Sequence, residues 1–180
     1  MGTAVQFEPE KLICAVLYRD RADAEAAVAE LTARFGAVDC SMEPYCFSEL
    51  SHYYDGEMDG TVRRLQLSFA DCRDPAELAA IKLFTNAVEQ HYAVAGNRRV
   101  NLDPGFVNPG RLTLATTKNA GHRIPLHDGI YAELTLFYAR GAWNAFPWTY
   151  MDFRLPAVQA FLSDVRRIYM QQRKSWLDKR

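Results

Sequence analysis

Residues 101–138 read NLDPGFVNPGRLTLATTKNAGHRIPLHDGIYAELTLFY, and this stretch decides the predicted fold. It contains three turn signals, Asp103-Pro104-Gly105, Asn108-Pro109-Gly110 and Asp128-Gly129, which separate strand-like runs. The strands follow one another with no helix between them. This favours an antiparallel sheet over a doubly wound parallel one.

The Asp128-Gly129 pair predicts a β-hairpin. An Asp-Gly pair between apolar runs typically forms a two-residue loop with both central residues at positive φ. With His127 and Ile130 flanking this loop, Leu126 is expected opposite Tyr131. Because side chains alternate along a strand, the register places one set on a common face: His122, Ile124, Leu126, Tyr131, Glu133 and Thr135. A slip of one residue would reverse the faces.

Residues 1–100 alternate between strand-like and helix-like patterns. The strand-like segments are Leu12–Tyr18, Val38–Phe47, Thr61–Phe69 and Arg98–Leu102, and the helix-like segments are Asp20–Phe35 and residues 74–96. Their order is β-α-β-β-α-β, as in ferredoxin-like folds.

The second part of the chain, residues 101–180, adds a β-meander and a closing amphipathic helix at 156–176. We therefore predict an α+β fold with a largely antiparallel sheet, formed by all 180 residues as one domain. A ferredoxin-like start is extended by the meander and the C-terminal helix.

Bulk properties exclude several classes of protein. The chain is 49% hydrophobic and 24% charged, which is typical of soluble globular proteins, and its formal net charge of −1 argues against nucleic acid or an anionic membrane as partner. No apolar run approaches the roughly 20 residues that span a bilayer. The start of the chain lacks signal-peptide character. The four cysteines have no C-x-x-C spacing, so reduced thiols in a cytoplasmic protein are expected.

Polar side chains gather in the central stretch beyond what solubility requires. Candidates for acid, base or metal-ligand roles are Asp103, His122 and Glu133, because carboxylates and imidazole transfer protons and bind divalent metals. Candidates for binding an anionic ligand are Thr116, Thr117, Lys118, Arg123 and Thr135. The open alternatives are an anion or nucleotide-like site, a divalent-metal site, and a polar strand face with ion pairs. Glu133 argues against the last, because it lies within an apolar run.

Two loops outside this stretch are unusual. The acidic run Asp55–Gly60 follows a His-Tyr-Tyr sequence, and it is interpreted as a solvated turn, a weak cation site or a lid over a cleft. Residues 144–154, NAFPWTYMDFR, crowd aromatic side chains around a proline. They either plug one end of the core or stack on a base or sugar.

The motifs NLDPG, LATTK, HRI, GIYAELTL and PWTY-x-D-x-R resemble an uncharacterised bacterial and archaeal family known only as a domain of unknown function. The resemblance covers nearly the whole chain. Some members carry the label GTP-binding protein, yet this sequence has no G-x-x-x-x-G-K-[ST] phosphate loop, and Ala120 stands where a T-K-x-D motif requires aspartate. A P-loop GTPase is therefore rejected.

Two functional classes remain. The first is an enzyme or binder acting on a small anionic ligand, phosphorylated or nucleotide-like, in a cleft lined by residues 101–138. The second is a non-catalytic module that binds a ligand or a partner. A deep pocket gathering Lys118, His122 and Glu133 would favour the first, and a flat apolar sheet face the second.

Overall fold

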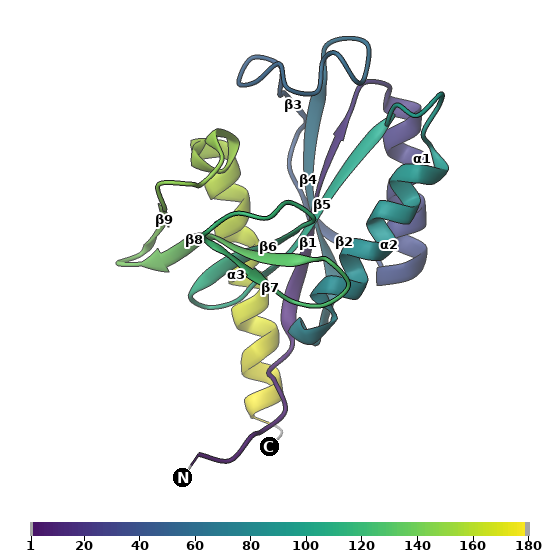
Figure 1. Ribbon diagram of the computed structural model, residues 1–180. Helices are drawn as coiled ribbons and strands as arrows, with labels where there is room; N and C mark the ends of the chain where they lie inside the picture. Colours follow the sequence, from purple (N-terminus) through teal and green to yellow (C-terminus); the bar gives the residue numbers. More distant parts are fainter. Residues whose placement is uncertain (1, 179–180) are drawn as a thin grey trace.

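A computed structural model of the chain describes residues 2–178, which form an antiparallel nine-stranded sheet and three α-helices (Figure 1). The predicted α+β class is confirmed. The helices are α1 Arg21–Phe35, α2 Leu78–His91 and α3 Pro156–Leu177, with short 3-10 turns η1 Pro75–Glu77 and η2 Met151–Arg154. The strands are β1 Glu10–Tyr18, β2 Val38–Ser41, β3 Tyr45–Cys46, β4 Arg63–Arg73, β5 Val100–Val107, β6 Arg111–Thr116, β7 Arg123–Pro125, β8 Tyr131–Ala139 and β9 Ala142–Ala145.

The sheet follows the order β2-β4-β1-β5-β6-β8-β7, with β3 beside β4 and β9 beside β8. The β-α-β-β-α-β order predicted for the first part is present, with β3 as a short addition. The extension departs from a simple meander. Strand β8, not β7, lies next to β6, and β7 lies on the far side of β8.

Both faces of the central strand β1 are buried, as its continuous apolar run predicts. Leu12, Cys14, Val16 and Tyr18 pack with α1 and α2, whereas Ile13 packs with α3. Figure 1 shows α1 and α2 together on one side of the sheet and α3 on the other. The α3 face also buries polar strand residues, among them Gln66, Ser68 and Arg64.

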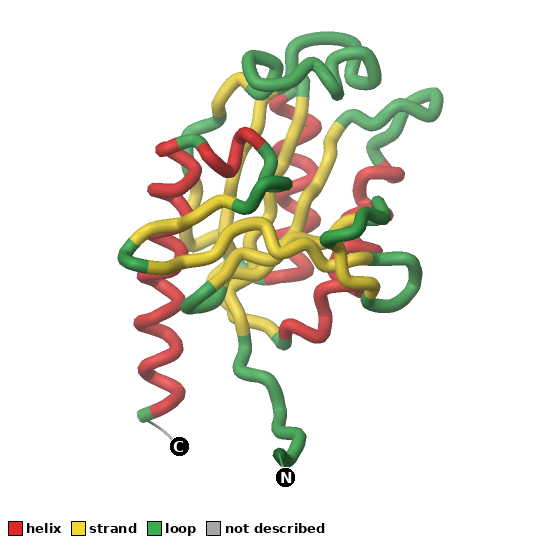
Figure 2. Tube along the Cα trace, turned by 60° about the vertical axis from the view of Figure 1, so that its left-hand side comes forward, coloured by secondary structure: helices red, strands yellow, loops and turns green. Residues whose placement is uncertain are grey.

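The sheet splits between β5 and β6. The two strands pair only at Gly105, Phe106 and Val107, and beyond that point β6 and β8 run across the direction of β1 and β5 (Figures 1 and 2). A Cβ atom on Gly105 would lie 2.5 Å from the carbonyl oxygen of Thr113, so the close crossing at the split requires glycine.

The predicted turn at Asp103-Pro104-Gly105 is wrong, because these residues lie inside β5. Backbone groups two residues apart in a strand point to the same side, so the missing N–H of Pro104 faces the same open edge as the N–H of Leu102. No neighbouring strand needs a donor there. Proline is tolerated in this strand because the sheet has already split.

The hairpin prediction is half right. Asp128 and Gly129 both have positive φ, 54° and 75°, as predicted. The Leu126 N–H, however, donates to the Ile130 carbonyl at 2.8 Å, and Pro125 rather than Leu126 lies opposite Tyr131. His127 is thus an extra loop residue and shifts the register by one.

The shift changes which side chains share a face. Arg123, not Ile124, lies opposite Glu133. A further irregularity in β8 pairs Leu134 with Thr113 and Leu136 with Leu112, which leaves Thr135 without a partner in β6. With Arg123 opposite Glu133, the register of β7 and β8 does not bring His122 opposite Thr135.

The four cysteines are free thiols, and we expect them to differ in reactivity. Burial raises the pKa of Cys14 beyond its ordinary range and that of Cys72 to about 11. The thiolate is the reactive form, and each unit by which the pKa rises lowers the thiolate population roughly tenfold.

At pH 8 a thiol reagent should label Cys46 first and Cys14 at least about 100-fold more slowly, as followed by mass spectrometry of the native chain. Rapid labelling of Cys14 would contradict the buried environment. The unfolded, unreduced chain should titrate all four thiols.

Within residues 2–178, no helix is both long and apolar enough to cross a membrane.

Candidate functional site

A cavity of about 650 Å³ opens where β5 and β6 separate. One wall is formed by β5 and the adjoining part of α2, the other by the end of β6 and the residues that follow it. The loop after β3 and the turn η2 close the remaining sides. Among the lining residues are Tyr53, Tyr54, Arg64, Lys82, Asn86, Glu89, Arg98, Asn101, Asp103, Thr116, Thr117, Lys118, Glu133, Tyr150 and Asp152.

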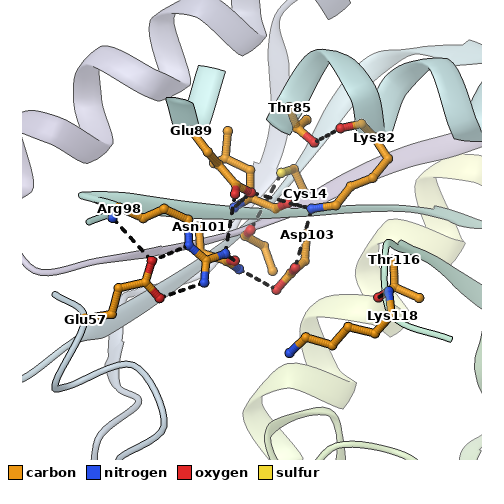
Figure 3. A network of polar contacts seen from close by, with 12 residues as sticks. Cys14, Glu57, Lys82, Thr85, Glu89, Arg98, Asn101, Asp103, Thr116 and Lys118 are labelled. Atoms are coloured by element: carbon orange, nitrogen blue, oxygen red, sulfur yellow. Dashed lines mark hydrogen bonds and ion pairs between the residues drawn. The ribbon is translucent and has the colours of Figure 1, made fainter. Parts of the chain in front are cut away.

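Two charged side chains of α2 hydrogen-bond to the backbone of β5 at the edge that no strand covers. The Leu102 N–H donates to the Glu89 carboxylate at 2.7 Å, and the Lys82 ammonium donates to the Leu102 carbonyl at 2.6 Å. Lys82 and Glu89 are themselves 3.5 Å apart (Figure 3). The N–H and carbonyl of Leu102, which a neighbouring strand would otherwise bind, are thus satisfied by side chains.

Burial raises the pKa of the Glu89 carboxyl above its ordinary value, and the opposing effect of the Lys82 ammonium is smaller. Glu89 is 5% exposed. Burial of this side chain therefore opposes its charged form.

Arg64 forms the floor of the cavity between two carboxylates. Its guanidinium lies 2.6 Å from Asp103 Oδ2 and 3.0 Å from Asp152 Oδ2. Burial alone lowers the pKa of Arg64, but Asp152 and Asp103 raise it above its ordinary value, so the side chain is a fixed cation. This contact ties β4 to β5 and to η2.

Arg98 lines the cavity and binds the acidic loop Asp55–Gly60. Its guanidinium makes two hydrogen bonds to Glu57, at 2.6 and 2.7 Å, and one to the Asn101 amide oxygen at 2.6 Å. The bond from Arg98 lowers the pKa of Glu57. Figure 3 shows this group on one side of the view and Thr116 with Lys118 on the other. The acidic loop is therefore anchored over the cavity by its own carboxylate.

The wall after β6 carries groups with few partners. Lys118 forms no ion pair among the described residues, and its ammonium lies 4.7 Å from the centre of the Tyr53 ring and 3.3 Å from the Tyr53 hydroxyl. Thr117 is exposed and makes no side-chain hydrogen bond within residues 2–178. Lys118 is thus a cation at the mouth with binding capacity to spare.

Three predicted site residues form a closed network beside the cavity. Glu133 is 2% exposed, and its Oε2 atom accepts from Arg123 Nε at 2.8 Å and lies 3.1 Å from His122 Nε2. The Arg123 guanidinium also donates to the Lys118 carbonyl and to the Tyr150 hydroxyl. The His122 ring stacks on Trp148 at 4.8 Å. This network secures the loop before β7 to β8.

The structure thus divides the predicted residues. Asp103, Thr116, Thr117, Lys118 and Glu133 line the cavity. His122 and Arg123 reach Glu133 from outside it. Thr135 is fully buried, and its hydroxyl donates to the Glu133 carbonyl at 3.2 Å. Among the described residues, no group of three or more His, Cys, Asp or Glu side chains is placed to hold a metal ion.

Sequence reasoning missed Arg64, Lys82, Glu89 and Arg98. A signal was present for two of them, because Lys82 and Glu89 occur seven residues apart on the apolar stripe of α2. Charged residues on the inner face of a helix are rarely buried without partners. No sequence signal distinguishes Arg64 from an exposed polar residue of an alternating strand.

Residues 8–169 of the chain match the family described as Domain of unknown function (DUF4416). No curated protein and no solved structure matches significantly. The resemblance expected from the motifs is therefore confirmed over nearly the whole chain.

Proposed function

We propose that this chain, which belongs to the family Domain of unknown function (DUF4416), binds a small phosphorylated ligand in the cavity between β5 and β6. The observation that carries the proposal is the position of Lys118 at the mouth of a charged cavity of about 650 Å³. That volume lies within the range of small-molecule sites.

Charge pairing within the cavity supports an anion at this place. Arg64, Lys82 and Arg98 each lie beside a carboxylate, so their charges are already compensated. Lys118 is not compensated in this way within the described part of the chain, and ammonium groups bind phosphate through charge-assisted hydrogen bonds. The hydroxyls of Thr116 and Thr117 lie next to it in sequence and supply further donors.

The proposal gives the other predicted residues different roles. Asp103 and Glu133 line the cavity beside the guanidinium groups of Arg64 and Arg123, and we assign them the role of hydrogen-bond acceptors. His122 supports the loop that carries Lys118.

Replacement of Lys118 by alanine tests the proposal. Binding of ribose 5-phosphate and of inorganic phosphate, measured by calorimetry on the full chain, should weaken about 10–100-fold, because a hydrogen bond to a charged group contributes about 1.5–3 kcal/mol. The melting temperature should stay nearly unchanged, since among residues 2–178 the Lys118 side chain hydrogen-bonds only to Tyr53. The control is Lys174→Ala, an exposed lysine on α3. Equal weakening in both variants, or none in Lys118→Ala, would refute the proposed site.

His122→Ala is expected to behave in the opposite way. Loss of its contacts with Glu133 and Trp148 should lower the melting temperature by several degrees, because about 1 kcal/mol corresponds to roughly 2–4 °C in a chain of this size. Affinity for phosphate at temperatures where the variant is folded should change less than in Lys118→Ala. A large affinity loss with an unchanged melting temperature would place His122 in the ligand site instead.

A further inference from the structure

We propose that the body of the ligand is a sugar, whose neighbouring hydroxyl groups bind Asp103 and Asn86 while its phosphate binds Lys118. The inference rests on the proposed function and adds the chemical class of the ligand. The sugar phosphate is either free or part of a ribonucleotide, since both present the same hydroxyls and the same anion.

Asp103 offers one carboxylate oxygen to the cavity. Its Oδ2 atom accepts from Arg64 at 2.6 Å and from Asn101 at 3.0 Å. Its Oδ1 atom faces only Lys82, at 4.0 Å, which is beyond hydrogen-bond distance, and the side chain is 27% exposed. An ionised carboxylate accepts hydrogen bonds and donates none. The free oxygen therefore selects a ligand group that carries a hydrogen-bond donor.

Asn86 provides the complementary group. It lies one helical turn after Lys82 on α2, lines the cavity, and makes no side-chain hydrogen bond within residues 2–178. An amide both donates and accepts, and so does the exposed hydroxyl of Thr117 on the opposite wall. The ligand groups that match an acceptor beside two such side chains are hydroxyls, which also donate and accept.

The ion pairs around Asp103 argue against a second ionic group on the part of the ligand that lies there. Asp103, Glu89 and Asp152 each lie beside an arginine or lysine of the protein. An anionic group would meet these carboxylates, and an additional cation would compete with Arg64 and Lys82 for them. Neutral neighbouring hydroxyls meet neither obstacle. Carboxylate binding of sugar hydroxyls also recurs where proteins hold ribose.

Aromatic residues at the mouth of the cavity distinguish a ribonucleotide from a free sugar phosphate. Tyr53 and Tyr150 line the cavity and are 65% and 48% exposed. Exposed aromatic rings stack on bases. A ribonucleotide would place its base against them, whereas a free sugar phosphate would leave them uncovered.

The experiment compares ligands that differ only in their hydroxyls, by calorimetry on the full chain. One arm uses ribose 5-phosphate and 2-deoxyribose 5-phosphate, and the other uses adenosine 5′-monophosphate and its 2′,3′-dideoxy analogue. We expect loss of a hydroxyl to weaken binding at least about tenfold in one arm. The arm with the tighter parent ligand identifies the source.

Two variants connect this difference to the named residues. Asn86→Ala removes no side-chain hydrogen bond within residues 2–178, so it should fold normally and should reduce the discrimination between parent and deoxy ligands to less than about threefold. Asp103→Asn should do the same, although it also touches Arg64. Unchanged discrimination in Asn86→Ala would overturn the assignment of that residue to the hydroxyls.

The outcomes separate the inference from the proposed function. If phosphate ligands bind through Lys118 but hydroxyls make no difference, the sugar inference is wrong and the phosphate site stands. If neither inorganic phosphate nor any of the four organic phosphates binds, both are wrong.

Discussion

Replacing Arg64 with methionine is expected to lower the free energy of unfolding by about 3–5 kcal/mol, the cost of leaving a buried charge without its partner. Here two carboxylates lose it, because Asp103 and Asp152 both contact the Arg64 guanidinium. The Arg64 side chain is 6% exposed and Asp152 is 1% exposed, so water does not replace the lost contact at Asp152. Urea denaturation of the variant and the natural chain measures the effect.

The control is Arg63→Met, one residue earlier on β4. Arg63 is exposed and donates only to the Pro44 carbonyl, so its replacement should cost less than about 1 kcal/mol. Adding Asp103→Asn and Asp152→Asn to the Arg64 variant removes the uncompensated charges and should recover at least half of the loss. A loss below about 1 kcal/mol in Arg64→Met would show that the two carboxylates are hydrated or protonated without the arginine.

The elements of this fold that local patterns determine could be predicted. The buried run of β1 and the apolar stripes of α1 and α2 are present as expected. In each, the periodicity of the side chains matches the environment they enter.

The split in the sheet could not be predicted in this way. Asp103-Pro104-Gly105 has the composition of a turn, and these residues remain extended because no strand pairs with Pro104 on the edge of β5 that faces away from β1. That absence depends on Lys82 and Glu89, which satisfy β5 from α2. A contact between segments about twenty residues apart thus decides the local conformation.

In the candidate site, too, residues within one stretch of sequence could be predicted, whereas those that depend on contacts between distant segments could not. Lys118, Thr117 and Asp103 were identified because their chemistry is concentrated in one stretch of sequence, and they line one cavity. Arg64 was missed because polar residues on an alternating strand usually face water. Here α3 and the loop after β3 cover that face, and the strand pattern carries no trace of either.

The second large loss of stability is expected when Glu133 loses its partner Arg123. Its position within an apolar run suggested a functional carboxylate, yet Arg123 and His122 satisfy it. Arg123→Met should lower the free energy of unfolding by about 3 kcal/mol, because the buried carboxylate then retains only His122 and a contact of 3.5 Å with the Thr135 hydroxyl among the described residues. The control Arg140→Met, at an exposed arginine that follows β8 and makes no side-chain hydrogen bond among the described residues, should change it by less than about 0.5 kcal/mol.

The double variant Arg123→Met with Glu133→Leu distinguishes a structural pair from a catalytic one. Replacing both partners of a buried ion pair with apolar side chains is often neutral, so the double variant should recover most of the stability lost in Arg123→Met. Phosphate affinity should recover only in part, because the double variant still lacks the Arg123 bond to the Lys118 carbonyl. A double variant that is as stable as the natural chain but binds no phosphate would show instead that Glu133, on the cavity wall, contacts the ligand itself.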